Sequence, residues 1–257
     1  MGNNDNKQYI YQHKFSSIVT SLFNQEERIV KARKSIEVMK DYLTSTGRST
    51  NELKLLDVGS STGHMTKYYS IFFKEIVGID IDTDAIEYAV HNNSSGNISY
   101  QYGSAMSIEF PSNSFDAVTC SHIYEHVPDA RQMLKEIHRV LRKDGFCYFV
   151  AGNRLNLIEA HYKLPLLSVI PKTWAHRYIR LAGIADSYYE THLSLWGLKE
   201  LVKDFKIRDY TFKIIEEPAK YSATDMITPG SFKQRISLFL INYAYWLCPT
   251  YIWILEK

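Results

Sequence analysis

Residues 55–63 of the sequence combine glycines, small hydroxyl side chains and a carboxylate. They read Leu-Leu-Asp-Val-Gly-Ser-Ser-Thr-Gly, which predicts a strand over Leu53–Val58, a turn, and a helix beginning near Gly63. A chain that passes through glycines into a helix leaves several backbone N–H groups unpaired and pointing toward one place. Gly59 allows a positive φ and the close approach of a ligand, and Asp57 can accept a hydrogen bond from an amine. The stretch therefore indicates a ligand with an anionic and a cationic end. The alternative is an ordinary strand–helix turn.

Two further segments follow predicted strands and can contact the same ligand. Asp80 ends the run Glu75–Asp80, where a carboxylate can accept from both hydroxyls of a ribose, and Ile81 can pack on a flat ring. Ser104 and Ala105 follow a third strand, where a backbone N–H and a small hydroxyl can contact the edge of a base. In a doubly wound sheet these strand ends meet at one edge. Together the segments describe a site for an adenosine-containing ligand.

The carboxylates of this region also have structural roles open to them. Asp57 can cap the helix that follows it, and Asp80 or Asp82 can cap the helix expected over Thr83–His91. We expect helix capping from Asp82 and ligand contact from Asp80.

The glycine spacing separates two classes of adenosine ligand. A dinucleotide fingerprint needs glycine at the first, third and sixth positions of its turn. Those positions are Gly59, Ser61 and His64, so the fingerprint fails twice. Asp57 would also repel a pyrophosphate. An aminoacyl sulfonium ligand suits the site better than a nicotinamide dinucleotide.

The elements that must position these residues alternate between strand and helix. Apolar runs predict strands, and a clear 3.6-residue period over Asp129–Arg142 predicts a helix that Asp129 caps and Gly145 closes. This alternation predicts an α/β fold: a Rossmann-like doubly wound sheet, mostly parallel, with helices on both faces. The strands expected are 53–58, 75–80, 98–102, 115–120 and 146–151.

The second half of the sequence is less regular. We expect helices over Ser194–Phe205 and Phe232–Trp246, a strand over Tyr210–Glu216, and a final antiparallel strand over Thr250–Leu255. The uncharged run Ile236–Leu255 approaches the length of a membrane span, but Pro249 divides it. A helix followed by a strand is therefore the better interpretation.

Charge and cysteine content narrow the class of protein. A formal net charge of +2 argues against duplex nucleic acid as a partner. Cys120, Cys147 and Cys248 match no metal spacing, so no metal site is predicted, and a reducing cytoplasm is the simplest compartment. The polar segment Met1–Lys7 has no secretory apolar core and is expected to be poorly ordered.

Several ordered blocks resemble the class I S-adenosylmethionine-dependent methyltransferases. Residues 55–63 resemble the first motif of that family, and Val77-Gly78-Ile79-Asp80-Ile81 resembles the second. The blocks 110–118 and 123–127, with Arg139-Val140-Leu141 and Gly145, resemble the subgroup related to ubiquinone-biosynthesis methyltransferases (type 11). The resemblance covers about Leu53 to Ala151 and implies S-adenosylmethionine as cofactor, with S-adenosylhomocysteine as product.

Carried over by position, the resemblance implies a role for each matching residue. Asp57, Gly59, Ser60, Ser61 and Gly63 would hold the methionine moiety of the cofactor. The ribose, the adenine and the sulfonium would meet Asp80, Ile81, Ser104, Ala105, Cys120 and Ser121. Two positions depart from the family: Ser61 replaces a glycine, and Ser104 replaces an acid that accepts from the adenine amino group.

Two histidines are candidates for catalysis. Methyl transfer is an in-line displacement, so alignment supplies much of the rate, but a hydroxyl acceptor benefits from a base. His122 follows the fourth strand and can face the acceptor, whereas His126 is the family's more usual histidine. A structural role is the alternative for each.

The remaining segments suggest how the chain is organised and what it acts on. We expect one domain, with an N-terminal helical cap (1–50), a cofactor core (51–153), a helical substrate lid (154–206), and C-terminal strands and a helix (207–257). Aromatic and basic residues over 161–180 resemble methyltransferases of bacterial polysaccharide and lipid biosynthesis, which implies a small-molecule, sugar or lipid-linked acceptor. The alternative for that segment is a small core of its own. Contact with the inner membrane face through 164–170 and 232–246 is a further hypothesis. A non-catalytic adenosyl-ligand-binding protein is the alternative function.

Overall fold

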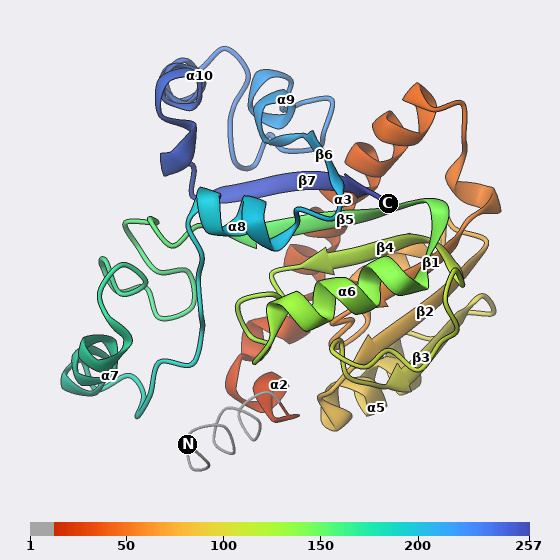
Figure 1. Cartoon of the computed structure of the whole chain (residues 1–257), viewed down its shortest axis with the longest axis horizontal. Helices are drawn as coiled ribbons and strands as arrows, with labels where there is room; N and C mark the ends of the chain where they lie inside the picture. The colour runs from red at the N-terminus through yellow and green to blue at the C-terminus, as the bar shows by residue number, and fades with distance from the viewer. Residues whose placement is uncertain (1–12) are drawn as a thin grey trace.

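A computed structural model describes residues 13–257, which form a seven-stranded sheet covered by helices (Figure 1). The strand order is β3-β2-β1-β4-β5-β7-β6. Strands β1 to β5 pair in parallel, whereas β7 runs antiparallel to both β5 and β6. In chain order the strands are β1 Lys54–Val58, β2 Glu75–Asp80, β3 Ile98–Tyr102, β4 Phe115–Ser121, β5 Leu141–Gly152, β6 Lys206–Asp209 and β7 Thr250–Glu256. The predicted doubly wound sheet with an antiparallel C-terminal strand is confirmed.

The helices lie on both faces of the sheet. Buried residues of α6 and α8 pack on one face, and those of α3, α4 and α9 pack on the other. The α-helices are α2 Phe15–Ile18, α3 Gln25–Ser45, α4 His64–Tyr69, α5 Thr83–Asn92, α6 Ala130–Val140, α7 Lys172–Leu181, α8 Leu195–Leu201, α9 Thr211–Glu216 and α10 Phe232–Ala244. Short 3₁₀ turns cover Thr20–Phe23 (η1), Thr50–Glu52 (η2) and Tyr245–Leu247 (η3).

Helix α7 belongs to a small core of its own, away from the sheet (Figure 1). Leu167, Ala175 and Ile179 are fully buried there, and Leu164 and Ile170 pack against them. The alternative interpretation of the 161–180 segment, a small core within the lid, therefore describes these apolar residues.

One predicted strand is wrong. Tyr210–Glu216 contains the helix α9, and the strand β6 lies just before it, over Lys206–Asp209. The Asp209 carboxylate accepts from the backbone N–H of Thr211 at 2.8 Å, which starts the helix. Ile214 is then buried in the core on the α3 face. Tertiary packing of this side chain outweighs the strand preference of a β-branched segment.

The helix predicted over Asp129–Arg142 is shorter than expected. Asp129 caps it by accepting from the N–H of Gln132, but the helix ends at Val140 and β5 begins at Leu141. Gly145 therefore lies within β5, where a Cβ would be 2.9 Å from the Arg142 carbonyl oxygen. A Cβ would also lie 3.1 Å from the Asp116 carbonyl oxygen, so a side chain here would displace backbone atoms on two strands.

The uncharged run Ile236–Leu255 divides as predicted. Its first part belongs to α10 and η3, and its last part forms β7 beyond Pro249. Within residues 13–257, no helix is both long and apolar enough to cross a bilayer. The segment Met1–Lys7 lies outside the described residues, and the division of the chain into cap, core, lid and C-terminal part stays a prediction.

Candidate active site

The loop between β1 and α4 lies at the switch point of the sheet, where the strand order reverses between β1 and β4. Gly59 has a φ of +75°, and a Cβ there would lie 2.2 Å from Cδ1 of Ile123. Only a glycine fits this position without displacing Ile123. The hydroxyls of Ser60 and Ser61 are buried and have no hydrogen-bond partner among the described residues. These two buried hydroxyls are available to hydrogen-bond a ligand in the cavity.

Asp57 is held by hydroxyl groups rather than by a helix end. Its carboxylate accepts from Thr66 Oγ1 at 2.6 Å and from Thr119 Oγ1 at 2.5 Å. Burial raises the pKa of Asp57, and these two hydrogen bonds and the charge of Arg28 oppose the rise. The side chain is thus fixed below the glycine loop.

Asp82 caps a helix, as predicted, whereas Asp80 has a different role. Asp82 caps α5 by accepting from the N–H of Ala85 at 3.1 Å. Asp80 instead accepts from the N–H groups of Ser61 and Asp82, at 2.8 and 2.9 Å. Burial raises the pKa of Asp80 to about 6, although these backbone hydrogen bonds act against it. The Asp80 carboxylate fixes the glycine loop and also lines the cavity next to it.

A cavity of about 500 Å³ extends from the glycine loop to residues 160–163. This volume is within the usual range for a small-molecule site. Most of the predicted site residues line it together: Asp57, Gly59, Ser60, Ser61, Asp80, Ile81, Ser104, Ala105, Ser121, His122 and His126.

Gly63 and Cys120 lie outside the cavity lining. Gly63 packs against Tyr100 and Ala89, where a Cβ would approach within 2.6 Å of the tyrosine oxygen. The thiol of Cys120 is fully buried in the core, 4.0 Å from the sulfur of Met133. Both residues therefore shape the packing behind the loop.

The N-terminal segment contributes residues that the sequence did not indicate. Phe15, Leu22 and Arg28 line the cavity, and Thr62 Oγ1 donates to the Leu22 carbonyl at 2.8 Å. The guanidinium of Arg28 makes no hydrogen bond or salt bridge with residues 13–257. Burial lowers its pKa, while the charges of Glu27, Asp57 and Asp80 act in the opposite direction. No sequence signal marked Arg28, because it is one of several basic residues along α3.

His122 faces the cavity with a carboxylate behind it. Its Nδ1 lies 3.1 Å from Glu125 Oε1, and its side chain is 44% exposed whereas that of Glu125 is fully buried. A φ of +57° turns the backbone at His122 directly after β4. A buried carboxylate that orients an accessible imidazole is the arrangement of a general base.

His126 is more enclosed than His122. Its side chain is 14% exposed, and its Nδ1 lies 3.8 Å from Glu190 Oε1. Burial lowers the pKa of His126 to about 4, although Glu125 opposes this shift, so the imidazole is neutral at pH 7. His161, from the loop after β5, stands against it with the ring centres 4.8 Å apart.

Comparison with known proteins agrees with this arrangement. A family model described as a methyltransferase domain matches residues 56–149. The uncharacterized methyltransferase YcgJ of Bacillus subtilis (strain 168) is 32% identical over 106 residues, which cover 40% of this chain and 42% of that protein. The ubiquinone biosynthesis O-methyltransferase of Actinobacillus pleuropneumoniae serotype 5b (strain L20) is 28% identical over 140 residues, covering 49% of this chain and 60% of that protein. The chain spans about half the length of these curated relatives.

Solved structures show the same fold. The crystal structure of YcgJ from Bacillus subtilis has a TM-score of 0.51 at 19% identity and covers 86% of this chain and 95% of that chain. An S-adenosylmethionine-dependent methyltransferase from Mesorhizobium loti has a TM-score of 0.54 at 12% identity and covers 84% and 96% of the two chains. The likeness extends beyond the matched domain to most of the sheet and its helices.

Proposed function

Since this chain belongs to the class I S-adenosylmethionine-dependent methyltransferases, we propose that it transfers a methyl group from S-adenosylmethionine to a hydroxyl of a small acceptor. One observation carries the proposal: a single cavity joins the glycine loop, Asp80 and the imidazole of His122. A site that only bound the cofactor would not need an oriented, accessible base at its far end.

The residues around the glycine loop fit the cofactor. The unpartnered hydroxyls of Ser60 and Ser61 and the guanidinium of Arg28 can meet the aminoacyl end, with Arg28 facing the carboxylate. Asp80 can accept from the ribose, and Ile81 and Ala105 flank the space for the adenine. When bound, the cofactor supplies an activated methyl group, and the protein supplies orientation and electrostatics.

His122 acts on the acceptor. Its exposed imidazole takes the proton of the acceptor hydroxyl, while Glu125 holds the ring through Nδ1. The methyl group is attacked by this oxygen, so the positions of the oxygen and the sulfonium decide the rate. Ile123 and Val127 line the cavity with apolar side chains.

The acceptor end of the cavity indicates an amphipathic acceptor with an anionic group. Phe15, Ile123 and Val127 supply apolar contacts, and Lys163 supplies positive charge, whereas Lys31 is paired with Glu27 at 2.7 Å. This mixture supports a small molecule, a sugar or a lipid-linked acceptor.

Calorimetry and mass spectrometry test the proposal. S-adenosylmethionine and S-adenosylhomocysteine should both bind to the purified protein, and a panel of hydroxylated acceptors should include one that gains a methyl group. Binding of both ligands with no methylated product would favour the non-catalytic alternative. Failure of both ligands to bind would reject the cofactor assignment itself.

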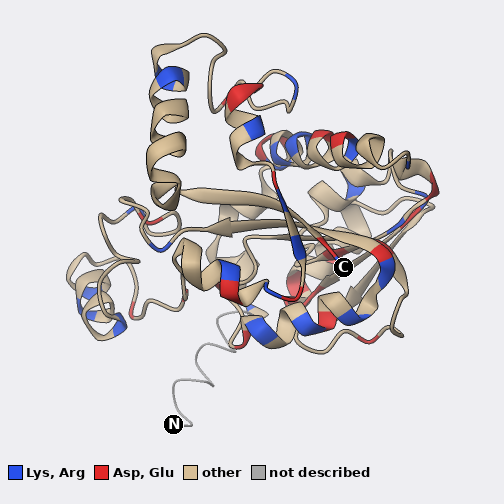
Figure 2. Ribbon diagram, turned by 45° about the horizontal axis from the view of Figure 1, so that its top comes forward, with Lys and Arg blue, Asp and Glu red and all other residues tan. Residues whose placement is uncertain are grey.

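We also propose that α10 contacts a membrane surface at the cytoplasmic face. Figure 2 shows little charge on α10, whereas α3 carries acidic and basic residues along its length. Phe232, Phe239 and Tyr243 of α10 are largely exposed, which favours an interfacial contact. The lid segment 164–170 contributes less than expected, because Leu164, Leu167 and Ile170 pack inward.

Flotation with liposomes tests this contact. The protein should rise with the vesicles, and replacing both Phe232 and Phe239 with Ser should abolish the effect. Ile71→Ser, which removes an equally exposed apolar side chain elsewhere, is the matched control. No co-flotation of the unmodified protein would overturn the proposal.

A further inference from the structure

Six titratable side chains are gathered beneath the lid, next to the acceptor end of the cavity. Three are carboxylates whose side chains are fully buried, and three are histidines. They come from three separate segments: the turn after β4, the loop after β5, and the stretch before α8. Buried carboxylates are stable only when hydrogen bonds or a positive charge compensate them. The six are Glu125, His126, Glu159, His161, Glu190 and His192.

Glu159 is fully compensated by its surroundings. Its Oε2 accepts from the backbone N–H groups of His161 and Tyr162, both at 2.7 Å. Its Oε1 lies 2.9 Å from Nδ1 of His161 and 3.3 Å from Nε2 of His192. These four donors explain why the pKa of Glu159 is far below its usual range, despite burial.

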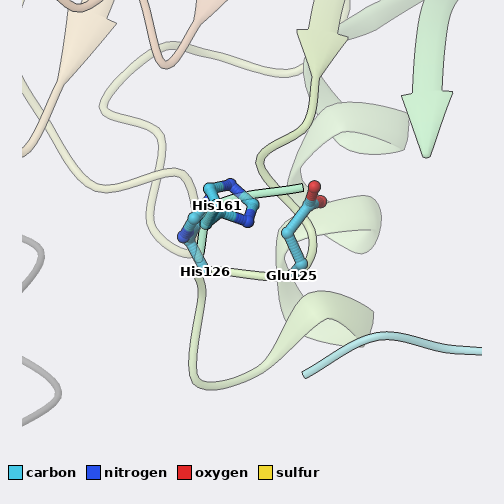
Figure 3. A group of neighbouring side chains, drawn as sticks. All are labelled: Glu125, His126 and His161. Atoms are coloured by element: carbon cyan, nitrogen blue, oxygen red, sulfur yellow. The ribbon is translucent and has the colours of Figure 1, made fainter. Parts of the chain in front are cut away.

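Glu125 is not compensated in the same way. Its Oε1 pairs with His122, but its Oε2 is buried and has no hydrogen-bond partner among the described residues. Glu125, His126 and His161 each offer one ligand atom, and these atoms lie within 4.8 Å of one another. Figure 3 shows the Glu125 carboxylate and the two imidazoles gathered at one place, with His161 arriving from a different segment.

We propose that Glu125, His126 and His161 bind one divalent transition-metal ion. Two imidazoles and one carboxylate are a frequent set for catalytic zinc and for non-haem iron, whereas magnesium and calcium prefer oxygen ligands. The Oε2 of Glu125 would gain in the ion the partner that it lacks.

The residues behind the two imidazoles support this site. Nδ1 of His161 faces Glu159, so its Nε2 is left for a metal, and His126 has Glu190 beside it. A carboxylate behind a metal-binding histidine fixes the ring and makes the other nitrogen a better ligand. The imidazole of His161 thus has the hydrogen-bonded second carboxylate that metal sites commonly provide, and Glu190 lies 3.8 Å from Nδ1 of His126, at ion-pair distance.

A second group, Glu159, His161 and His192, also has ligand atoms within 4.8 Å of one another. We prefer the Glu125 group because the oxygens of Glu159 already have four donors. Two members of the Glu125 group, His126 and His161, line the cavity, whereas His161 alone does so in the second group. An ion held by Glu125, His126 and His161 would therefore have an open position toward the acceptor.

This open position suggests what the ion does, a role that rests on the proposed function. A bound hydroxyl oxygen would lose its proton more readily, because a metal ion stabilises the anion. His122, which shares Glu125 with the site, stands ready to take that proton. The ion would thus hold and activate the oxygen that accepts the methyl group.

Metal titration of the purified chain tests the site without any need for activity. After treatment with a chelator, the protein should bind one Zn²⁺ per chain and should show no comparable affinity for Mg²⁺. Glu125→Gln and His161→Ala should each weaken Zn²⁺ binding by about 10- to 100-fold or more. His91→Ala, which changes an exposed histidine on α5, should leave it unchanged. Circular dichroism should show that all variants are folded.

Two results would overturn the proposal. The first is a wild-type protein that binds no Zn²⁺, or binds it equally well in Glu125→Gln and His161→Ala. The second is binding that persists in Glu125→Gln but is lost in His192→Ala, which would place the ion at the other group. Titration of the same samples with S-adenosylmethionine keeps the tests separate, because cofactor binding can succeed or fail independently of the metal.

Discussion

The two walls of the cavity surround their buried carboxylates with different donors. On the sheet wall, residues 57–61, 80–82 and 103–105, Asp57 and Asp80 accept from threonine hydroxyls and backbone N–H groups. On the lid wall, residues 122–127 and 159–163, Glu125 and Glu159 face imidazoles. Hydroxyl and amide groups do not titrate near neutral pH. Imidazoles can gain or lose a proton in this range, and they can bind a metal ion.

This difference separates binding from chemistry. The sheet wall holds a ligand in one fixed arrangement, and the lid wall can take up a proton or a cation. Substitutions on the sheet wall should therefore change cofactor affinity, and those on the lid wall should change turnover.

The largest effect is expected from His122→Ala on the lid wall. Removing the base should lower turnover by about 100- to 10,000-fold, the usual contribution of general base catalysis. Affinity for S-adenosylmethionine should not change, because His122 lies at the acceptor end. Steady-state kinetics with an accepted substrate and calorimetry with the cofactor measure the two quantities. Unchanged turnover would remove His122 from the mechanism, and an equal loss of affinity would erase the distinction between the walls.

Gly59→Val should produce the largest loss on the sheet wall. The new side chain would clash with Ile123 and force a β-branched residue to a φ of +75°. Backbone strain of about 1–3 kcal/mol corresponds to roughly a 5- to 150-fold loss of cofactor affinity if the loop relaxes to relieve it. Gly183 has a similar φ of +67° but open space around it, so Gly183→Ala is the control. Full affinity in Gly59→Val would show that the loop does not hold the cofactor.

Arg28→Met tests whether Arg28 binds the carboxylate of the cofactor. Losing a charge-assisted hydrogen bond of about 1.5–3 kcal/mol should weaken S-adenosylmethionine binding by about tenfold or more. The ligand 5′-methylthioadenosine lacks the carboxylate, so its affinity should be the same for both proteins. A similar loss with both ligands would contradict the pairing of Arg28 with the carboxylate.

The pH dependence of cofactor binding should follow Asp80. Burial raises its pKa to about 6, so the carboxylate is ionised above this pH and able to accept from the ribose. As the pH falls below about 6, affinity should drop by up to tenfold per unit. The pKa of Asp57 is raised as well, so calorimetry from pH 5 to pH 8 needs Asp80→Asn for comparison. The variant should bind more weakly and show a flatter profile; an unchanged profile would exclude Asp80.

The smallest effect is expected in the stability of the metal-free protein when Glu159 or Glu125 is replaced by Gln. Glu159→Gln removes a charge with four donors and should lower the free energy of unfolding by about 2 kcal/mol at pH 7. Because the pKa of Glu159 is depressed, this stability exists above the unfolded pKa and is lost as the pH falls. Glu125→Gln should cost less, since one oxygen has no donor. Urea unfolding measures both, and equal costs would contradict the difference in compensation.

The sheet wall could be predicted from the sequence because its residues directly follow strands. Alternating strands and helices place those strand ends at one edge, so the order of the elements is enough to bring Asp57, Gly59 and Asp80 together. The predictions from sequence are wrong where packing against residues distant in the sequence determines the local structure. Tyr210–Glu216 alternates like a strand, yet Ile214 belongs to a helix and is buried in the core on the α3 face of the sheet.

The lid wall could be predicted only in part. His122, Glu125 and His126 belong to a block that follows β4, but His161 reaches this block from the loop after β5. Glu125 and His161 are 36 positions apart, a spacing that matches no local metal motif. Arg28 was missed for a related reason: which basic side chain of a long helix faces a ligand depends on how the helix packs.

The position of β7 has a consequence for how the chain folds during synthesis. Within residues 13–257, strand β6 pairs with the sheet only through β7, although β7 follows it by about 40 residues. When β6 leaves the ribosome, the strand that must pair with it has not yet been made. Strand β5 likewise keeps an unpaired edge until that moment, and such edges favour aggregation. Strand β6 therefore has no partner strand until Thr250–Glu256 emerges.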